Sequence, residues 1–71
     1  MIRKSVRSSN VASIGYDLGL RILEVQFLSG AIYQYLKVPE SLYHRLMEAP
    51  SKGSFLNEYV KNAGFRYVQI C

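Results

Sequence analysis

The sequence predicts a single small α+β domain in which an antiparallel β-meander precedes two short helices and a C-terminal strand, in the order β-β-β-α-α-β. Two patterns predict it: apolar residues alternate with polar ones in the first half of the chain, and they recur at i,i+4 in the second half. The 71 residues form one domain, 1–71, and a composition of 49% apolar and 20% charged residues is typical of a folded protein. We expect both helices on one face of the sheet.

The predicted strands are bounded by turn residues. Ser8-Ser9-Asn10 forms the first turn, and the strand after it places Ala12, Ile14 and Tyr16 on one face. Asp17-Leu18-Gly19 then turns the chain into a second strand. The predicted strands cover residues 11–17, 20–27, 31–36 and 65–70.

The first predicted helix begins at Val38-Pro39, because proline suits the first turn of a helix, and it ends before Pro50. Its apolar stripe consists of Leu42, Tyr43, Leu46 and Met47. His44 and Glu48 are spaced i,i+4 on this helix, but we expect them to form a solvent-facing pair because no further metal ligand is apparent.

The second predicted helix is capped by Ser51 or Ser54 and ends at Asn62-Ala63-Gly64. The pairs Phe55/Tyr59 and Leu56/Val60 repeat the i,i+4 pattern. Gly53 lies in the first turn, where glycine lowers helix stability. We therefore expect Gly53 to allow close packing against the first helix.

The loop between the second and third strands decides where Tyr33 and Tyr35 point. A two-residue loop, Ser29-Gly30, places both rings outside, as a platform for stacking. A three-residue loop, 28–30, pairs Val25 with Tyr33 and Leu23 with Tyr35 and buries them. We favour the longer loop, because its last residue adopts a positive φ that suits Gly30, whereas the shorter loop forces one on Ser29.

Charge and composition narrow the possible functions. Nine Lys and Arg residues against five Asp and Glu give a net charge of +4, which favours anionic partners. Cys71 is the only cysteine, and no long apolar run is present, so we expect a cytoplasmic protein with no membrane segment. One histidine and scattered carboxylates supply no catalytic constellation, and we expect no enzyme activity, metal or cofactor.

Five motifs occur in order along the chain: residues 6–11 (VRSSNV), 15–17 (GYD), 33–35 (YQY), 38–39 (VP) and 51–57 (SKGSFLN). Together they resemble the KTSC domain family, which is named for a C-terminal extension of some lysyl-tRNA synthetases and also occurs as free-standing small bacterial proteins. The resemblance implies an unestablished function, with RNA binding suggested by the synthetase context, and no catalytic residues. The motif residues to which we give a structural role are Tyr33, Tyr35, Ser51, Gly53, Phe55 and Asn57.

Two hypotheses of function follow. The first is a non-catalytic module that binds RNA or tRNA through basic surface residues. The candidate phosphate contacts are Arg3, Lys4, Arg7, Lys37, Lys52 and Lys61. The alternative is a protein-interaction or homodimer module, in which a partner covers Ile22, Ile32 and Leu36 on the outer sheet face.

Overall fold

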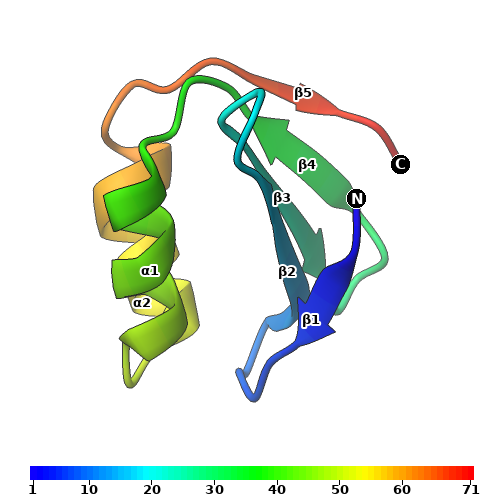
Figure 1. Ribbon diagram of the computed structural model, residues 1–71. Helices are drawn as coiled ribbons and strands as arrows, with labels where there is room; N and C mark the ends of the chain where they lie inside the picture. The colour runs from blue at the N-terminus through cyan, green and yellow to red at the C-terminus, as the bar shows by residue number, and fades with distance from the viewer.

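A computed structural model describes all residues, 1–71, and confirms an α+β domain with both helices on one face of an antiparallel sheet (Figure 1). The elements in chain order are β1 (Arg3–Ser5), β2 (Val11–Asp17), β3 (Ile22–Phe27), β4 (Ile32–Tyr35), α1 (Glu40–Glu48), α2 (Lys52–Leu56), the π-helical turn η1 (Asn57–Lys61) and β5 (Tyr67–Gln69). The five strands lie in sequence order, β1-β2-β3-β4-β5, and every neighbouring pair is antiparallel.

Strand β1 is the main departure from the predicted order, which becomes β-β-β-β-α-α-β. Its residues, Arg-Lys-Ser, carry no apolar alternation, so nothing in this segment predicts a strand. It forms because it pairs with β2, where Arg3 lies opposite Gly15 and Ser5 opposite Ser13.

The β3–β4 hairpin has the predicted three-residue loop. Phe27 N donates to Ala31 O at 2.9 Å, and Gly30 has a φ of 99°. Val25 therefore pairs with Tyr33 and Leu23 with Tyr35, which confirms the predicted register. Both tyrosines point toward the helices.

Two details of the earlier strands differ from prediction. A register shift between Val11 and Ser13 brings Val11 opposite Phe27, so Val11, and not Ala12, joins Ile14 in the core. The turn after β2 also extends to Arg21, which has a φ of 56°, so the next strand begins at Ile22.

The helices begin and end largely as predicted. Ser51 Oγ accepts a hydrogen bond from Ser54 N at 3.4 Å and caps α2. Gly64, with a φ of 85°, prevents the helical turns from continuing after η1. Gly53 does allow close packing, but the prediction that it packs against the first helix is wrong. A Cβ at this position would lie 2.5 Å from Asn10 Oδ1, so Gly53 allows close approach of the β1–β2 loop instead of α1.

The hydrophobic core lies between the helices and the inner face of the sheet, which we define as the face toward the helices (Figure 1). Its buried members are Val11, Ile14, Leu23, Val25, Tyr35, Val38, Leu46, Leu56 and Val60. Each is less than 4% exposed. No helix is long and apolar enough to cross a membrane.

The outer face carries a buried polar network. Arg3 Nη1 forms an ion pair with Glu24 Oε2, and Arg3 Nε donates to Ser13 Oγ at 3.1 Å. Gln34 Nε2 donates to Glu24 Oε1 at 2.8 Å. Burial alone raises the pKa of Glu24, but the hydrogen bonds from Gln34 and Arg3, together with the Arg3 charge, lower it overall.

Gly15 makes that network possible. It lies between Arg3 and Glu24 in the same row of the outer face, since Arg3 pairs with Gly15 and Gly15 with Glu24. A Cβ on Gly15 would lie 2.9 Å from Ile2 O and 3.0 Å from Arg3 Cγ. The missing side chain therefore leaves the path by which Arg3 crosses β2 to reach the carboxylate.

Candidate functional site

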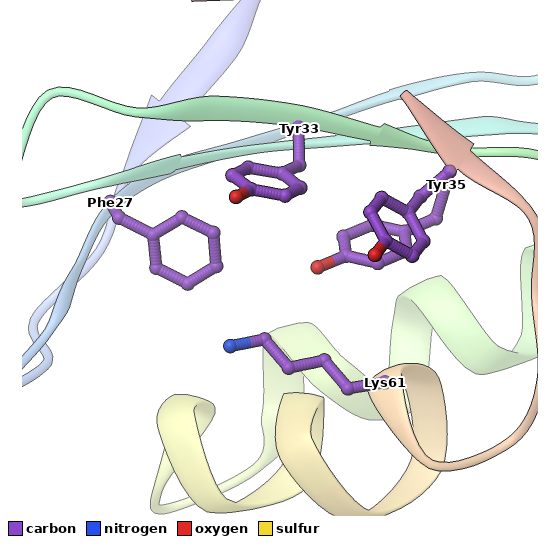
Figure 2. Close-up of a pocket in the computed structure, with 5 residues that line it drawn as sticks. Phe27, Tyr33, Tyr35 and Lys61 are labelled. Carbon is purple, nitrogen blue, oxygen red and sulfur yellow. The ribbon is translucent and has the colours of Figure 1, made fainter. Parts of the chain in front are cut away.

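A pocket of about 260 Å³ lies between the sheet and η1, where the helices no longer cover the aromatic side chains of the inner face (Figure 2). Its lining residues are Phe27, Tyr33, Tyr35, Lys61 and Tyr67. We call this the aromatic pocket.

The sheet register assembles the aromatic pocket. Tyr33 and Tyr35 alternate along β4, and Tyr67 pairs with Tyr35 from the edge strand β5. The Tyr33 and Tyr35 rings are tilted by 19° to each other, with centroids 6.4 Å apart. Phe27, at the end of β3, meets Tyr33 edge-on at 89° and closes one end of the pocket.

The pocket rings differ in exposure. Tyr35 is 3% exposed, Tyr33 is half-buried, and Tyr67 is 60% exposed. Burial and the neighbouring tyrosines raise the pKa of Tyr35, so its phenol stays protonated at neutral pH. The Tyr33-Gln34-Tyr35 motif therefore forms the inner wall, and the exposed ring available for stacking belongs to Tyr67.

Lys61 stands at the open side of the pocket. It ends η1, and its Nζ lies 4.8 Å from the centroid of the Phe27 ring (Figure 2). Lys61 takes part in neither of the two ion pairs of the chain, Arg3–Glu24 and His44–Glu40, and no carboxylate lines the pocket. Its ammonium is thus free to meet an anionic group.

A second, shallower hollow has a volume of about 450 Å³, and its lining residues directly follow Tyr35 or precede Tyr67 in the sequence. Its lining residues are Leu36, Lys37, Gly64, Phe65 and Arg66. Leu36 N donates to Arg66 O at 2.8 Å, which joins the end of β4 to the segment before β5. We call this the basic hollow, since Lys37 and Arg66 line it without a carboxylate.

The six predicted basic contacts fall into two groups. Arg3 is paired with Glu24, and Lys52 Nζ donates to Ala49 O at 2.7 Å near the end of α1, so both hold structure. The other four are exposed and outside the ion pairs: Lys4, Arg7, Lys37 and Lys61. Of these, only Lys37 and Lys61 line a hollow.

Among the residues that line the two hollows, sequence reasoning missed Phe27, Gly64, Phe65 and Arg66 as members of a site. Tyr67 carried a signal, because it alternates with polar Arg66 in the last predicted strand. The grouping of Phe27 and Tyr67 with Lys61 depends on the packing of η1 against the sheet, which no local pattern encodes.

The remaining motif residues, Phe55 and Asn57, contact other parts of the chain and line neither hollow. Phe55 packs against Tyr59 with ring centroids 4.6 Å apart and a tilt of 34°, and the Arg45 guanidinium lies 5.5 Å from the Phe55 centroid. Asn57 is exposed, and its backbone carbonyl accepts a hydrogen bond from Asn62 N at 3.1 Å.

His44 pairs differently from the predicted arrangement. His44 and Glu48 both face solvent, as predicted, but His44 Nε2 lies 3.0 Å from Glu40 Oε2, one turn earlier in α1, so the pairing with Glu48 is wrong. No group of three or more His, Cys, Asp or Glu residues is placed to hold a metal ion.

Comparison with known proteins places this arrangement in a family. The KTSC domain model matches residues 7–67. A crystal structure of a KTSC domain protein from Yersinia pestis superposes with a TM-score of 0.93 at 43% identity and covers 99% of this chain and 97% of that chain. An uncharacterised protein from Stutzerimonas stutzeri is 43% identical over 99% of both chains.

Part of a much longer protein is also similar. A lysine–tRNA ligase from Nostoc punctiforme is 36% identical over 62 residues, which is 87% of this chain and 11% of the ligase. The same fold therefore occurs as a separate small protein and as a segment of a larger enzyme.

Proposed function

This chain belongs to the KTSC domain family, and we propose that it is a non-catalytic cytoplasmic module that binds single-stranded RNA. One observation carries the proposal: the exposed ring of Tyr67 and the free ammonium of Lys61 line the same pocket, and two further cationic side chains, Lys37 and Arg66, line a second hollow. Neither hollow contains a carboxylate.

The chemistry of these groups suits single-stranded RNA. An exposed aromatic ring stacks on a base whatever its identity, while lysine and arginine contact the phosphates on either side. The net charge of +4 raises the local concentration of such a ligand. Similarity to segments of lysine–tRNA ligases supports the same class of ligand.

The groups in the hollows also favour binding over catalysis. The titratable groups of the aromatic pocket are three phenols and one lysine, and the phenol of Tyr35 has a raised pKa. A protonated phenol donates a hydrogen bond but is a poor general base at neutral pH. We therefore assign the polar groups of the pocket to recognition.

The proposal is tested by titrating labelled single-stranded RNA and a tRNA into the protein at two salt concentrations. With about three phosphate contacts, the affinity for single-stranded RNA is expected to fall roughly 20-fold between 50 and 200 mM salt. Lys37→Met and Arg66→Met are expected to weaken binding, whereas Lys4→Met, at an exposed lysine that lines neither hollow, serves as a control for charge. Absence of binding at low salt, or binding that is insensitive to salt, contradicts the proposal.

The alternative is a protein-interaction or homo-oligomerisation module, which the exposed Val68 and Ile70 near the edge strand β5 favour, at 46% and 50% exposure. The predicted apolar patch of Ile22, Ile32 and Leu36 is half-buried, and the polar Arg3–Glu24 network occupies the same outer face. Sedimentation equilibrium at high concentration tests this alternative. A monomer at every concentration contradicts homo-oligomerisation.

A further inference from the structure

We propose that the aromatic pocket holds one unpaired nucleobase, with a phosphate of the same nucleotide on the Lys61 ammonium. This inference rests on the proposed RNA-binding function and specifies the part of the ligand that enters the pocket. Four observations support it: the size of the pocket, the arrangement of its rings, the free hydroxyls of its walls, and the position of Lys61.

The size of the pocket limits the ligand to one small ring system. Its volume of about 260 Å³ lies just below the range of about 300–1,000 Å³ found for drug-sized ligands. A single base fits this scale, whereas a stacked dinucleotide does not. Any neighbouring nucleotide of the RNA must lie outside, toward the exposed Tyr67.

The rings form a slot suited to a flat ligand. Tyr33, Tyr35 and Tyr67 are inclined to one another by 19°, 34° and 44°, so they make one continuous aromatic wall. Phe27 stands perpendicular to Tyr33 and closes the end of the slot. The Lys61 side chain extends from η1 on the opposite side (Figure 2). A base between wall and lysine stacks with one face on Tyr33 and Tyr67, the wall rings with exposed surface, and contacts the aliphatic stem of Lys61 with the other.

The wall also offers unused hydrogen-bonding groups. The hydroxyl of Tyr16 donates to Val38 O, but the hydroxyls of Tyr33 and Tyr35 make no hydrogen bond within the chain. No buried side-chain oxygen lacks a partner, so these two hydroxyls keep solvent-accessible surface although Tyr35 is 3% exposed. The accessible surface next to both rings is the pocket. The two hydroxyls are therefore free to hydrogen-bond a ligand in the pocket.

Lys61 supplies the charge that separates a nucleotide from a neutral aromatic ligand. Its Nζ lies above the Phe27 ring and has no carboxylate partner. A phosphate bound there forms a charge-assisted hydrogen bond next to the slot. A cationic ligand is disfavoured, because the pocket already contains this ammonium.

The test uses the whole chain and ribonucleotides of one unit. The protein has six tyrosines and no tryptophan, so quenching of tyrosine fluorescence reports stacking directly. The 5′- and 3′-monophosphates of the four ribonucleosides are titrated, with the four nucleosides and inorganic phosphate in parallel. Quenching by nucleotides, weaker quenching by nucleosides and none by phosphate are expected. NOEs between base protons and the ring protons of Tyr33 and Tyr67 then place the base.

Matched variants separate the pocket from the rest of the surface. Lys61→Met keeps the aliphatic stem and is expected to weaken mononucleotide binding about fivefold while nucleoside binding is unchanged. Lys4→Met removes the same charge at an exposed lysine that lines neither hollow, and should leave mononucleotide binding unchanged. Tyr67→Ala is expected to weaken nucleotide and nucleoside binding at least about fivefold. Circular dichroism verifies that each variant folds.

The outcomes distinguish this inference from the proposed function. If single-stranded RNA binds with salt dependence but mononucleotides leave the pocket tyrosines unchanged, the base-binding inference is wrong and the proposed function stands. If Lys61→Met and Lys4→Met affect mononucleotide binding equally, Lys61 is not the phosphate contact and the inference is also wrong. If no RNA binds at low salt, both proposals are wrong.

Discussion

The two faces of the sheet are closed in different ways. On β3, Leu23 and Val25 point inward and are fully buried against the helices, whereas Glu24, between them, points outward and is still only 5% exposed. The inner face excludes water by apolar packing. The outer face has no helix, and its central carboxylate is covered by Arg3 and Gln34.

This difference shows how a thin domain covers both sides of one sheet. Apolar packing gives most of the stability, and the polar network lets β1 join without a second hydrophobic layer. The inner face is incompletely covered near β5, where Tyr67 is exposed and the aromatic pocket lies. The place where apolar packing ends is thus the place where a ligand can enter.

The largest effect is expected from the inner face. Leu23→Ala removes a fully buried side chain and should lower the free energy of unfolding by about 3 kcal/mol, since it loses burial and leaves a cavity. Urea unfolding measures the change. Leu20→Ala, at a residue that is 67% exposed, is the control and should stay within about 0.5 kcal/mol of the wild type. Equal effects at the two positions would contradict this account of the core.

The next effect concerns the outer face. Arg3→Ala takes an ionic partner from the buried Glu24 carboxylate and should lower the free energy of unfolding by about 2 kcal/mol. Adding Glu24→Gln should recover part of this loss, because the neutral amide is less costly to bury unpaired. Lys4→Ala, in the same strand but exposed, should change stability little. An equal loss from Lys4→Ala would refute the role of the ion pair.

Two glycines allow a finer comparison. In Gly15→Ala the new Cβ would lie 2.9 Å from Ile2 O, so the backbone of Ile2 must move away. We expect this to lower the free energy of unfolding by about 1–2 kcal/mol. Gly53→Ala meets only the end of the exposed Asn10 side chain, which can turn away, and gains about 1 kcal/mol of helix propensity. Its stability should therefore change by less than that of Gly15→Ala. Thermal unfolding of both variants measures the two changes in stability. A larger loss in Gly53→Ala than in Gly15→Ala would be inconsistent with the arrangement of Arg3 over Gly15.

The smallest effect is a pH dependence of the outer face. The pKa of Glu24 is lower in the folded chain than its usual value of 4.5, so its ionised form stabilises the fold above that value. This contribution should be lost as the pH falls from about 5 through the folded pKa. The loss should disappear in Glu24→Gln, as measured by urea unfolding at several pH values. An identical pH profile in that variant would exclude Glu24 as the source.

Local patterns in the sequence were sufficient for much of the fold. The positive φ of Gly30 selected the three-residue loop, and that loop fixed which face of the sheet carries Tyr33 and Tyr35. Alternation along β3 and the Ser51 cap likewise act over a few residues. Steric and hydrogen-bonding rules at this range can be applied without knowing the rest of the molecule.

Tertiary structure alone decided the features that join distant segments. Strand β1 depends on its pairing with β2 and on the ion pair of Arg3 with Glu24, which are 21 residues apart, and the need for glycine at position 53 depends on Asn10 in the β1–β2 loop. The candidate site depends on Lys61, which η1 brings to Phe27 from across the core. Turn sterics and periodicity determined strands β2 to β4 from the sequence, whereas β1 and the pocket arise from long-range packing that no local pattern contains.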